Sequence, residues 1–166
     1  MQFEKGGDLE HFEFLADGAT DPRKDFFYKQ MPLLDKASTI FAFNIGFEKG
    51  RLREVAIFLG EEAWCEQVQN KFLDLITPFQ KFHYYHPSQA GSASLKKVHP
   101  LFSSKSYDEL DVADGGAAMC AFSAIMNGSL DQDEASRMRR SLLEYCKLDT
   151  FAMVEILNGL YSLVSA

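Results

Sequence analysis

The sequence has few cysteines and no long apolar run, and both shortages exclude classes of protein. Its three cysteines, Cys65, Cys120 and Cys146, lie far apart without a C-x-x-C pair, so neither a disulfide framework nor a zinc ribbon is predicted. No stretch approaches the roughly 18 consecutive apolar residues of a membrane span, and no apolar signal region follows the polar first residues. We therefore expect a soluble, cytoplasmic protein that makes no membrane contact.

An excess of positive charge is missing as well. The formal net charge is -7 over 166 residues. Because non-specific coating of nucleic acid depends on Lys and Arg neutralising phosphates, this charge argues against that kind of binding but leaves room for a local basic strip. The length and the 46% hydrophobic content suit one ordinary globular domain over residues 1–166.

Apolar periodicity predicts the elements of the first part of the chain. Residues 2–4 and 9–15 are expected to be two strands of a hairpin, since large apolar residues alternate with polar neighbours. Asp21-Pro22 is typical of a helix start, and that helix is expected to run to about residue 36. Residues 39–43 are the best candidate for a parallel strand in the middle of a sheet, covered on both faces.

Two helices are predicted next, over residues 52–59 and 64–72, with a break at Gly60. Residues 72–75 fit either a short strand or the end of the second helix. The small, polar residues 87–94 predict a mobile loop.

The last part of the chain is expected to be helical. A helix over residues 115–126 closes at Asn127-Gly128, and the longest helix runs from about residue 133 to 163. The order of elements predicts an α/β chain with a mixed sheet flanked by helices.

Asp149 does not fit the pattern of this last helix. Stepping 100° per residue places it at the centre of an apolar face whose members lie within about 60° of it. These members are Met138, Leu142, Tyr145, Cys146, Met153, Ile156 and Leu160. An ionised carboxylate in apolar surroundings costs several kcal/mol unless it is paired, hydrogen-bonded or metal-bound. Asp149 is therefore either a core aspartate bonded to an amide, hydroxyl or cation, or part of a functional site.

A second group of polar residues follows the predicted parallel strand. That strand ends at Asn44, a glycine-containing turn follows, and Phe47-Glu48 opens a helix. In open α/β sheets, ligands collect at the carboxyl ends of the strands. Each residue also has a simpler interpretation. Glu48 can be an acidic residue in the first turn of a helix, where the helix dipole favours negative charge, and Asn44 can be a cap of the helix or turn.

Together, Asn44-x-x-Phe47-Glu48 and Tyr145-x-x-x-Asp149 resemble the second and third motifs of RNase H-like 3′–5′ exonucleases, the DnaQ-like or DEDD superfamily. Asp74-Leu75 and the stretch at residues 94–97 resemble segments between those motifs, so the resemblance spans roughly residues 9–160. The stretches HFEFLADG, DPR, HYYHP, SLKKV and LLEYCKLDTFAMV also resemble an uncharacterised bacterial domain family related to these enzymes, usually found in the C-terminal part of longer chains.

The resemblance implies two divalent ions, Mg²⁺ or Mn²⁺, held by carboxylates that include Glu48 and Asp149. It implies that Tyr145 orients the attacking water and that Asn44 and Phe47 hold the strand rim and the terminal nucleotide. Lys96 or Lys97 is expected either to meet a phosphate or to be one of a solvated lysine pair. Glu48 and Asp149 are then catalytic together with Tyr145, and single-stranded nucleic acid is the substrate.

The first motif of that superfamily, an Asp-x-Glu on the central strand, is not found in this sequence. The closest stretch, residues 2–4, has glutamine in place of aspartate. We interpret residues 2–15 as the second and third strands, so that the chain lacks the first, central strand and half of the metal ligands. The strand at residues 39–43 would then expose an apolar edge, which dimerisation would cover.

Other constellations fit simpler roles. His83-x-x-His86 lies among aromatic residues without a cysteine or acid at structural-zinc spacing, and Cys146 lies on the predicted buried helix face. Two hypotheses remain. The chain is either an exonuclease domain, incomplete as given, or an inactive RNase H-like module used for interaction or dimerisation in a larger bacterial protein.

Overall fold

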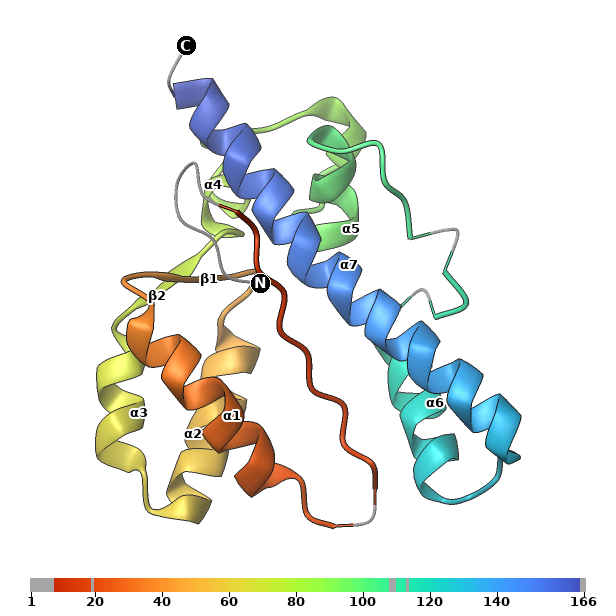
Figure 1. The fold of residues 1–166 in the computed structure, drawn as a ribbon. Coiled ribbons are helices and arrows are strands. Elements are labelled where there is room, and N and C mark those ends of the chain that lie inside the picture. The colour runs from red at the N-terminus through yellow and green to blue at the C-terminus, as the bar shows by residue number, and fades with distance from the viewer. Residues whose placement is uncertain (1–7, 19, 108–109, 113, 165–166) are drawn as a thin grey trace.

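The computed structural model describes residues 8–18, 20–107, 110–112 and 114–164. The elements are α1 (Arg23–Lys36), β1 (Ile40–Ala42), α2 (Gly46–Leu59), α3 (Glu62–Gln69), β2 (Phe72–Asp74), α4 (Thr77–Gln80), the 3₁₀ turn η1 (Pro87–Gln89), α5 (Leu95–Val98), the 3₁₀ turn η2 (His99–Leu101), α6 (Gly115–Met126) and α7 (Gln132–Val164). The fold is mainly helical with one small sheet, so it is α/β in character but richer in helix than predicted (Figure 1).

The sheet consists of β1 and β2, which pair in parallel with Phe41 opposite Leu73. The prediction of a parallel strand at residues 39–43 is confirmed, and the ambiguous residues 72–75 contain the second strand. A mixed sheet was expected, but within the described residues the sheet has these two strands alone.

The predicted strand at residues 9–15 is wrong, because this segment is irregular apart from one bridge residue, Glu10. The guanidinium of Arg139 on α7 donates hydrogen bonds to the backbone carbonyls of Leu15 and Ala16, at 3.1 and 2.8 Å. A distant side chain, rather than a neighbouring strand, thus satisfies part of this backbone. The other predicted arm of the hairpin, residues 2–4, lies outside the described residues.

The predicted helices are confirmed, with ends within a few residues of those expected, and α2 begins one residue before the predicted helix start at Phe47-Glu48. α2 ends at Gly60, whose φ of 76° belongs to the left-handed region that glycine adopts without strain. No helix in the described part of the chain combines the length and apolar content needed to cross a membrane.

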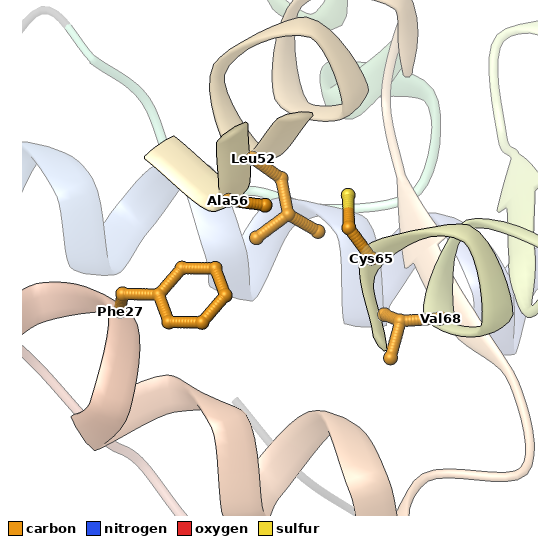
Figure 2. Packing of buried hydrophobic residues seen from close by; sticks show 5 residues of the cluster. All are labelled: Phe27, Leu52, Ala56, Cys65 and Val68. Carbon is orange, nitrogen blue, oxygen red and sulfur yellow. The ribbon is translucent and has the colours of Figure 1, made fainter. Parts of the chain in front are cut away.

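Three hydrophobic clusters hold these elements together. The first joins α1, α2 and α3 through Phe27, Leu52, Ala56, Cys65 and Val68, whose side chains converge in Figure 2. Ile40 and Phe72 pack against this cluster from one face of the sheet. Leu73 points to the other face and is 55% exposed, so the predicted cover on both faces holds for one face only.

The other two clusters lie along α7. This helix begins after the turn that follows α6 and runs past α5 towards the C-terminus (Figure 1). The second cluster is built on Phe79, Val98 and Ile156, and the third on Val112, Ala121 and Leu142. One helix therefore contributes a buried residue to each of two cores.

Candidate functional site

Asp149 lies on α7 between the second and third clusters. Leu142 and Ile156, seven residues to either side of it, are 4% and 0% exposed. The predicted opposite face, which carries Arg140, Glu144, Lys147 and Asn158, is exposed. The predicted buried stripe is thus confirmed for its main members, whereas Cys146 at its border is exposed rather than buried.

Hydroxyl groups meet the carboxylate of Asp149. The Tyr107 hydroxyl donates a hydrogen bond of 2.8 Å to Asp149 Oδ1. The Tyr145 hydroxyl, one turn earlier on α7, also interacts with this carboxylate and lowers its pKa. The structure therefore brings together the two residues that the sequence paired at i and i+4, and adds a third residue, Tyr107, that the sequence did not reveal.

Burial dominates the electrostatics of this group. It raises the pKa of Asp149 above its ordinary value, although the Tyr107 hydrogen bond, the Tyr145 hydroxyl and the nearby charges of Lys96 and His99 lower that pKa. Burial is also the main reason why the pKa values of Tyr107 and Tyr145 are raised, with the negative charge of Asp149 adding to the effect. Both hydroxyls therefore remain protonated donors at neutral pH.

Lys96 on α5 stands at the border of this group. Its Nζ lies 5.8 Å from the centroid of the Tyr107 ring, and its charge favours the ionised forms of both Asp149 and Asp114. Its side chain is exposed, so the ammonium is available to an anion from solvent.

His99 provides a second polar contact between η2 and α7. Its fully buried ring makes a 2.7 Å hydrogen bond from Nε2 to Glu155. Its Nδ1 is buried and has no hydrogen-bond partner in the described part of the chain. The ring also packs edge-on against Tyr107, with centroids 6.0 Å apart.

Glu48 lies in a different environment, in the first turn of α2 after β1. Glu48 is itself solvent-exposed. The desolvation of its carboxylate by nearby protein atoms is the main cause that raises its pKa, and the negative charge of Asp74 at the end of β2 adds to it. Asp74 accepts hydrogen bonds from the backbone N–H groups of Asn44, Ile45 and Ile76, at 2.8, 3.1 and 3.1 Å. Two carboxylates thus stand at the carboxyl end of the two-stranded sheet.

The other predicted residues of this edge are solvent-accessible. Asn44 is exposed and adopts a left-handed φ of 67°, which turns the chain from β1 into α2. The Phe47 ring is 69% exposed, and the Arg51 guanidinium lies 5.7 Å from its centroid.

The polar residues around Asp149 and those around Glu48 border the same hydrophobic cluster. Phe43, immediately before Asn44, packs into the second cluster, as do Leu95 beside Lys96 and Ile156 two turns after Asp149. The charged neighbour of Glu48 is Asp74, whereas those of Asp149 are Lys96 and His99. Among the described residues, no group of three His, Cys, Asp or Glu side chains is placed to hold a metal ion.

The simpler interpretation of the histidine pair agrees with the structure. The Nδ1 of His86 lies 2.7 Å from the hydroxyl of Ser88, and the backbone N–H of His86 donates to the Gln89 side chain. These contacts make His86 the cap of η1, within the segment predicted as a loop.

Comparisons with known proteins identify relatives but no activity. Over 127 residues the chain is 29% identical to a protein of Mycoplasma pneumoniae described as "Uncharacterized protein MG366 homolog". The matched region is 69% of this chain and 19% of that relative, so the chain spans about a fifth of the relative's length. No solved structure shows a significant match. The model of the family described as "Domain of unknown function (DUF2779)" matches residues 1–94, more than half of the chain, and the chain therefore belongs to this family.

Proposed function

We propose that this chain is the RNase H-like part of a 3′–5′ exonuclease that hydrolyses phosphodiester bonds of single-stranded DNA or RNA. The observation that carries the proposal is the placement of Asp149, a partly buried carboxylate that accepts a hydrogen bond from Tyr107 and has Tyr145 beside it. The resemblance of Asn44-x-x-Phe47-Glu48 and Tyr145-x-x-x-Asp149 to exonuclease motifs supports it. So does the position of Glu48 at the carboxyl end of parallel strands, where ligands of open sheets collect.

The carboxylate oxygens of Glu48 and Asp149 are of the kind that Mg²⁺ and Mn²⁺ prefer as ligands. Burial raises the pKa of Glu48 and of Asp149. By the resemblance to the exonuclease motifs, Glu48 and Asp149 are the residues of this chain that would hold divalent ions. When bound, such ions stabilise charge on the attacking and leaving oxygens of the phosphodiester.

Further ligands are needed, because no triple of candidate ligands occurs among the described residues. The relative is about five times as long as its matched region, so a longer protein has room for them. We infer that the remaining ligands belong to a longer native protein of which this chain forms a part, so that this chain supplies part of the active site.

The remaining chemistry belongs to side chains of the chain itself. The Tyr145 hydroxyl stays protonated beside Asp149, and its oxygen has lone pairs that can accept a hydrogen bond from water. Such a water would be oriented by Tyr145. The exposed ammonium of Lys96 is placed to meet a phosphate, and the exposed ring of Phe47 offers a face on which a base can stack.

The test is degradation of an end-labelled single-stranded oligonucleotide with Mn²⁺, by this chain and by the longer native protein. Wild type is compared with Asp149→Asn and with Glu144→Gln, a change on the exposed face of the same helix. We expect the longer protein to give a ladder that Asp149→Asn reduces at least about 100-fold, because the substitution removes a metal ligand. Glu144→Gln should leave the ladder unchanged, and equal activity in all three proteins would contradict the proposal.

A second candidate function is an inactive module that serves interaction or dimerisation. The observation in its favour is the open face of the sheet, where Leu73 is 55% exposed. Absence of any ladder from the longer wild-type protein would favour this candidate.

A further inference from the structure

Phe82 adopts a backbone conformation that bulky residues rarely take. Its φ of 55° belongs to the left-handed region, directly after the end of α4. The backbone N–H of His83 donates to the Pro78 carbonyl at 2.8 Å, and that of Phe82 donates to the Phe79 carbonyl at 3.3 Å. This is the hydrogen-bond pattern of a Schellman motif, in which glycine is the usual residue at the left-handed position. A phenylalanine there carries a strain that glycine would avoid.

The hydrophobic core does not account for this phenylalanine. Phe82 is 67% exposed, and Tyr85, whose ring centroid lies 5.7 Å from that of Phe82, is 47% exposed. Tyr84 packs inward instead, with its ring 5.8 Å from that of Phe79 and 5.6 Å from that of Phe102. The inward ring anchors the turn, so the two outward rings are held together at the surface.

The segment that carries these rings lacks acidic residues. None of the 24 aspartates and glutamates of the chain lies between Leu75 and Tyr107, although the net charge of the whole chain is -7. The same segment has four exposed lysines, of which the first directly precedes Phe82: Lys81, Lys96, Lys97 and Lys105. A positively charged segment of this kind attracts anions.

The turn after α4 lies at the end of the sheet where ligands of open sheets collect. The backbone N–H of Leu75 donates to the Ala42 carbonyl at 2.9 Å, which places the segment leading into α4 beside the carboxyl end of β1. Phe79 of α4 packs against Phe43, the residue before Asn44, with centroids 6.4 Å apart. α4 lies on one side of the strands and α1, α2 and α3 on the other (Figure 1).

We propose that Phe82 and Tyr85, with Lys81 beside them, form a binding surface for single-stranded nucleic acid. Unpaired bases stack on exposed aromatic rings, and lysines near the rings neutralise the phosphates. A single strand offers both flat bases and negative charge, so it matches an aromatic pair in an acid-free segment better than an apolar peptide does. The inference goes beyond the proposed hydrolysis, because it needs neither Asp149 nor a metal ion.

The experiment measures binding of fluorescein-labelled oligo(dT) and oligo(U) to this chain by fluorescence anisotropy, in EDTA at low salt. EDTA prevents metal-dependent cleavage, so binding is measured separately from hydrolysis. Wild type should bind, with an affinity that falls as the salt concentration rises. Binding of either oligonucleotide supports the inference, and the tighter of the two identifies the preferred sugar.

Phe82→Gly separates binding from folding. It removes the ring and relieves the strain of the left-handed position. The variant should therefore melt at a temperature no lower than that of wild type, while its binding weakens roughly ten- to a hundredfold. Tyr85→Phe keeps the ring and should bind as wild type does. Phe58→Ala is the matched control, because it removes a ring of similar exposure, 56%, from α2 and should leave binding unchanged.

Phe82→Asn repeats the test if Phe82→Gly does not fold, since asparagine also tolerates the left-handed region. A folded variant of either kind that binds as tightly as wild type would overturn the inference. A wild-type chain that binds neither oligonucleotide at low salt would overturn it as well. Sedimentation in which wild type self-associates and Phe82→Gly does not would then assign the two rings to a protein contact. Failure of the exonuclease test leaves the inference intact, because binding in EDTA does not depend on cleavage.

Discussion

At the scale of single residues, Asp149 shows how the chain accommodates a charge on the face of a helix that faces its core. The Tyr107 hydroxyl donates a hydrogen bond to it and Tyr145 lies beside it, yet burial outweighs both and the pKa of Asp149 is raised. The ionised form is therefore less stable in the folded chain than in the unfolded chain. The fold carries this energetic cost at a position where an apolar residue would fit the helix pattern.

We predict that Asp149→Asn stabilises the fold at neutral pH when no divalent ion is present. An acid whose folded-state pKa lies above its unfolded value loses folded-state stability as the pH rises through the folded pKa. At pH 7 the variant should be more stable by on the order of 1 kcal/mol or less, since Asp149 is partly solvent-exposed. The gain should vanish as the pH falls towards the ordinary pKa of 3.8.

Thermal melting in a chelating buffer between pH 4 and 8 measures this difference. Glu144→Gln, on the exposed face of the same helix, controls for the loss of a negative charge. A variant that is less stable than wild type at pH 7 would mean that the carboxylate contributes stability, contrary to the raised pKa.

The residues of the candidate site differ in how well the sequence predicts them. Asp149 interrupts a helical stripe, and such an interruption is visible in the sequence alone. The contacts of Tyr107 with Asp149 and of His99 with Glu155 join residues 42 and 56 positions apart. The segments of Tyr107 and His99 are too short or too irregular to show a period, so no local pattern points to these pairs.

At the scale of secondary-structure elements, Asp74 connects the two strands to α2. Its carboxylate accepts backbone hydrogen bonds from Asn44, Ile45 and Ile76. It thereby satisfies donors at the end of β1 and after β2, and it holds the turn in which Asn44 adopts a positive φ.

We predict that Asp74→Ala destabilises the fold by about 2–3 kcal/mol, because it leaves partly buried N–H groups without an acceptor. Asp74→Asn keeps one acceptor oxygen and should cost less. Urea denaturation followed by circular dichroism measures both variants. Equal stability of Asp74→Ala and Asp74→Asn would show that the turn does not depend on these hydrogen bonds.

Helices were more predictable than strands for a physical reason. α2 and α7 carry several turns of apolar residues at helical spacing, and Gly60 ends α2 by its backbone freedom. The alternation at residues 9–15 suits a strand, but a strand needs a neighbour to pair with. Arg139 donates to backbone carbonyls of this segment instead. No local sequence pattern predicts a hydrogen bond between residues 123 positions apart.

At the scale of the whole molecule, the described residues leave Leu73 exposed on one side of the sheet. Helices α1, α2 and α3 cover the face of Ile40 and Phe72, while Leu73 on the other face is 55% exposed. In the described part of the chain, β1 and β2 pair only with each other as strands. Open apolar surface of this kind favours association.

We predict that this chain dimerises through the open side of its sheet. Leu73→Lys should weaken the dimer about tenfold or more, because it places a charge in the contact. Leu163→Lys is the control, since Leu163 is similarly exposed, at 52%, near the end of α7. Sedimentation velocity over a range of concentrations measures both, and a wild-type chain that stays monomeric at every concentration would contradict the prediction.

The shared role of α7 in two cores restricts how this protein can change. Leu142 and Ile156 anchor the helix in different clusters, with Asp149 midway between them. One inserted or deleted residue between these anchors would turn one cluster by about 100° relative to the other and carry Asp149 off its face. Natural variants are therefore expected to keep the length of this segment constant, while the identities of its outward-facing residues drift.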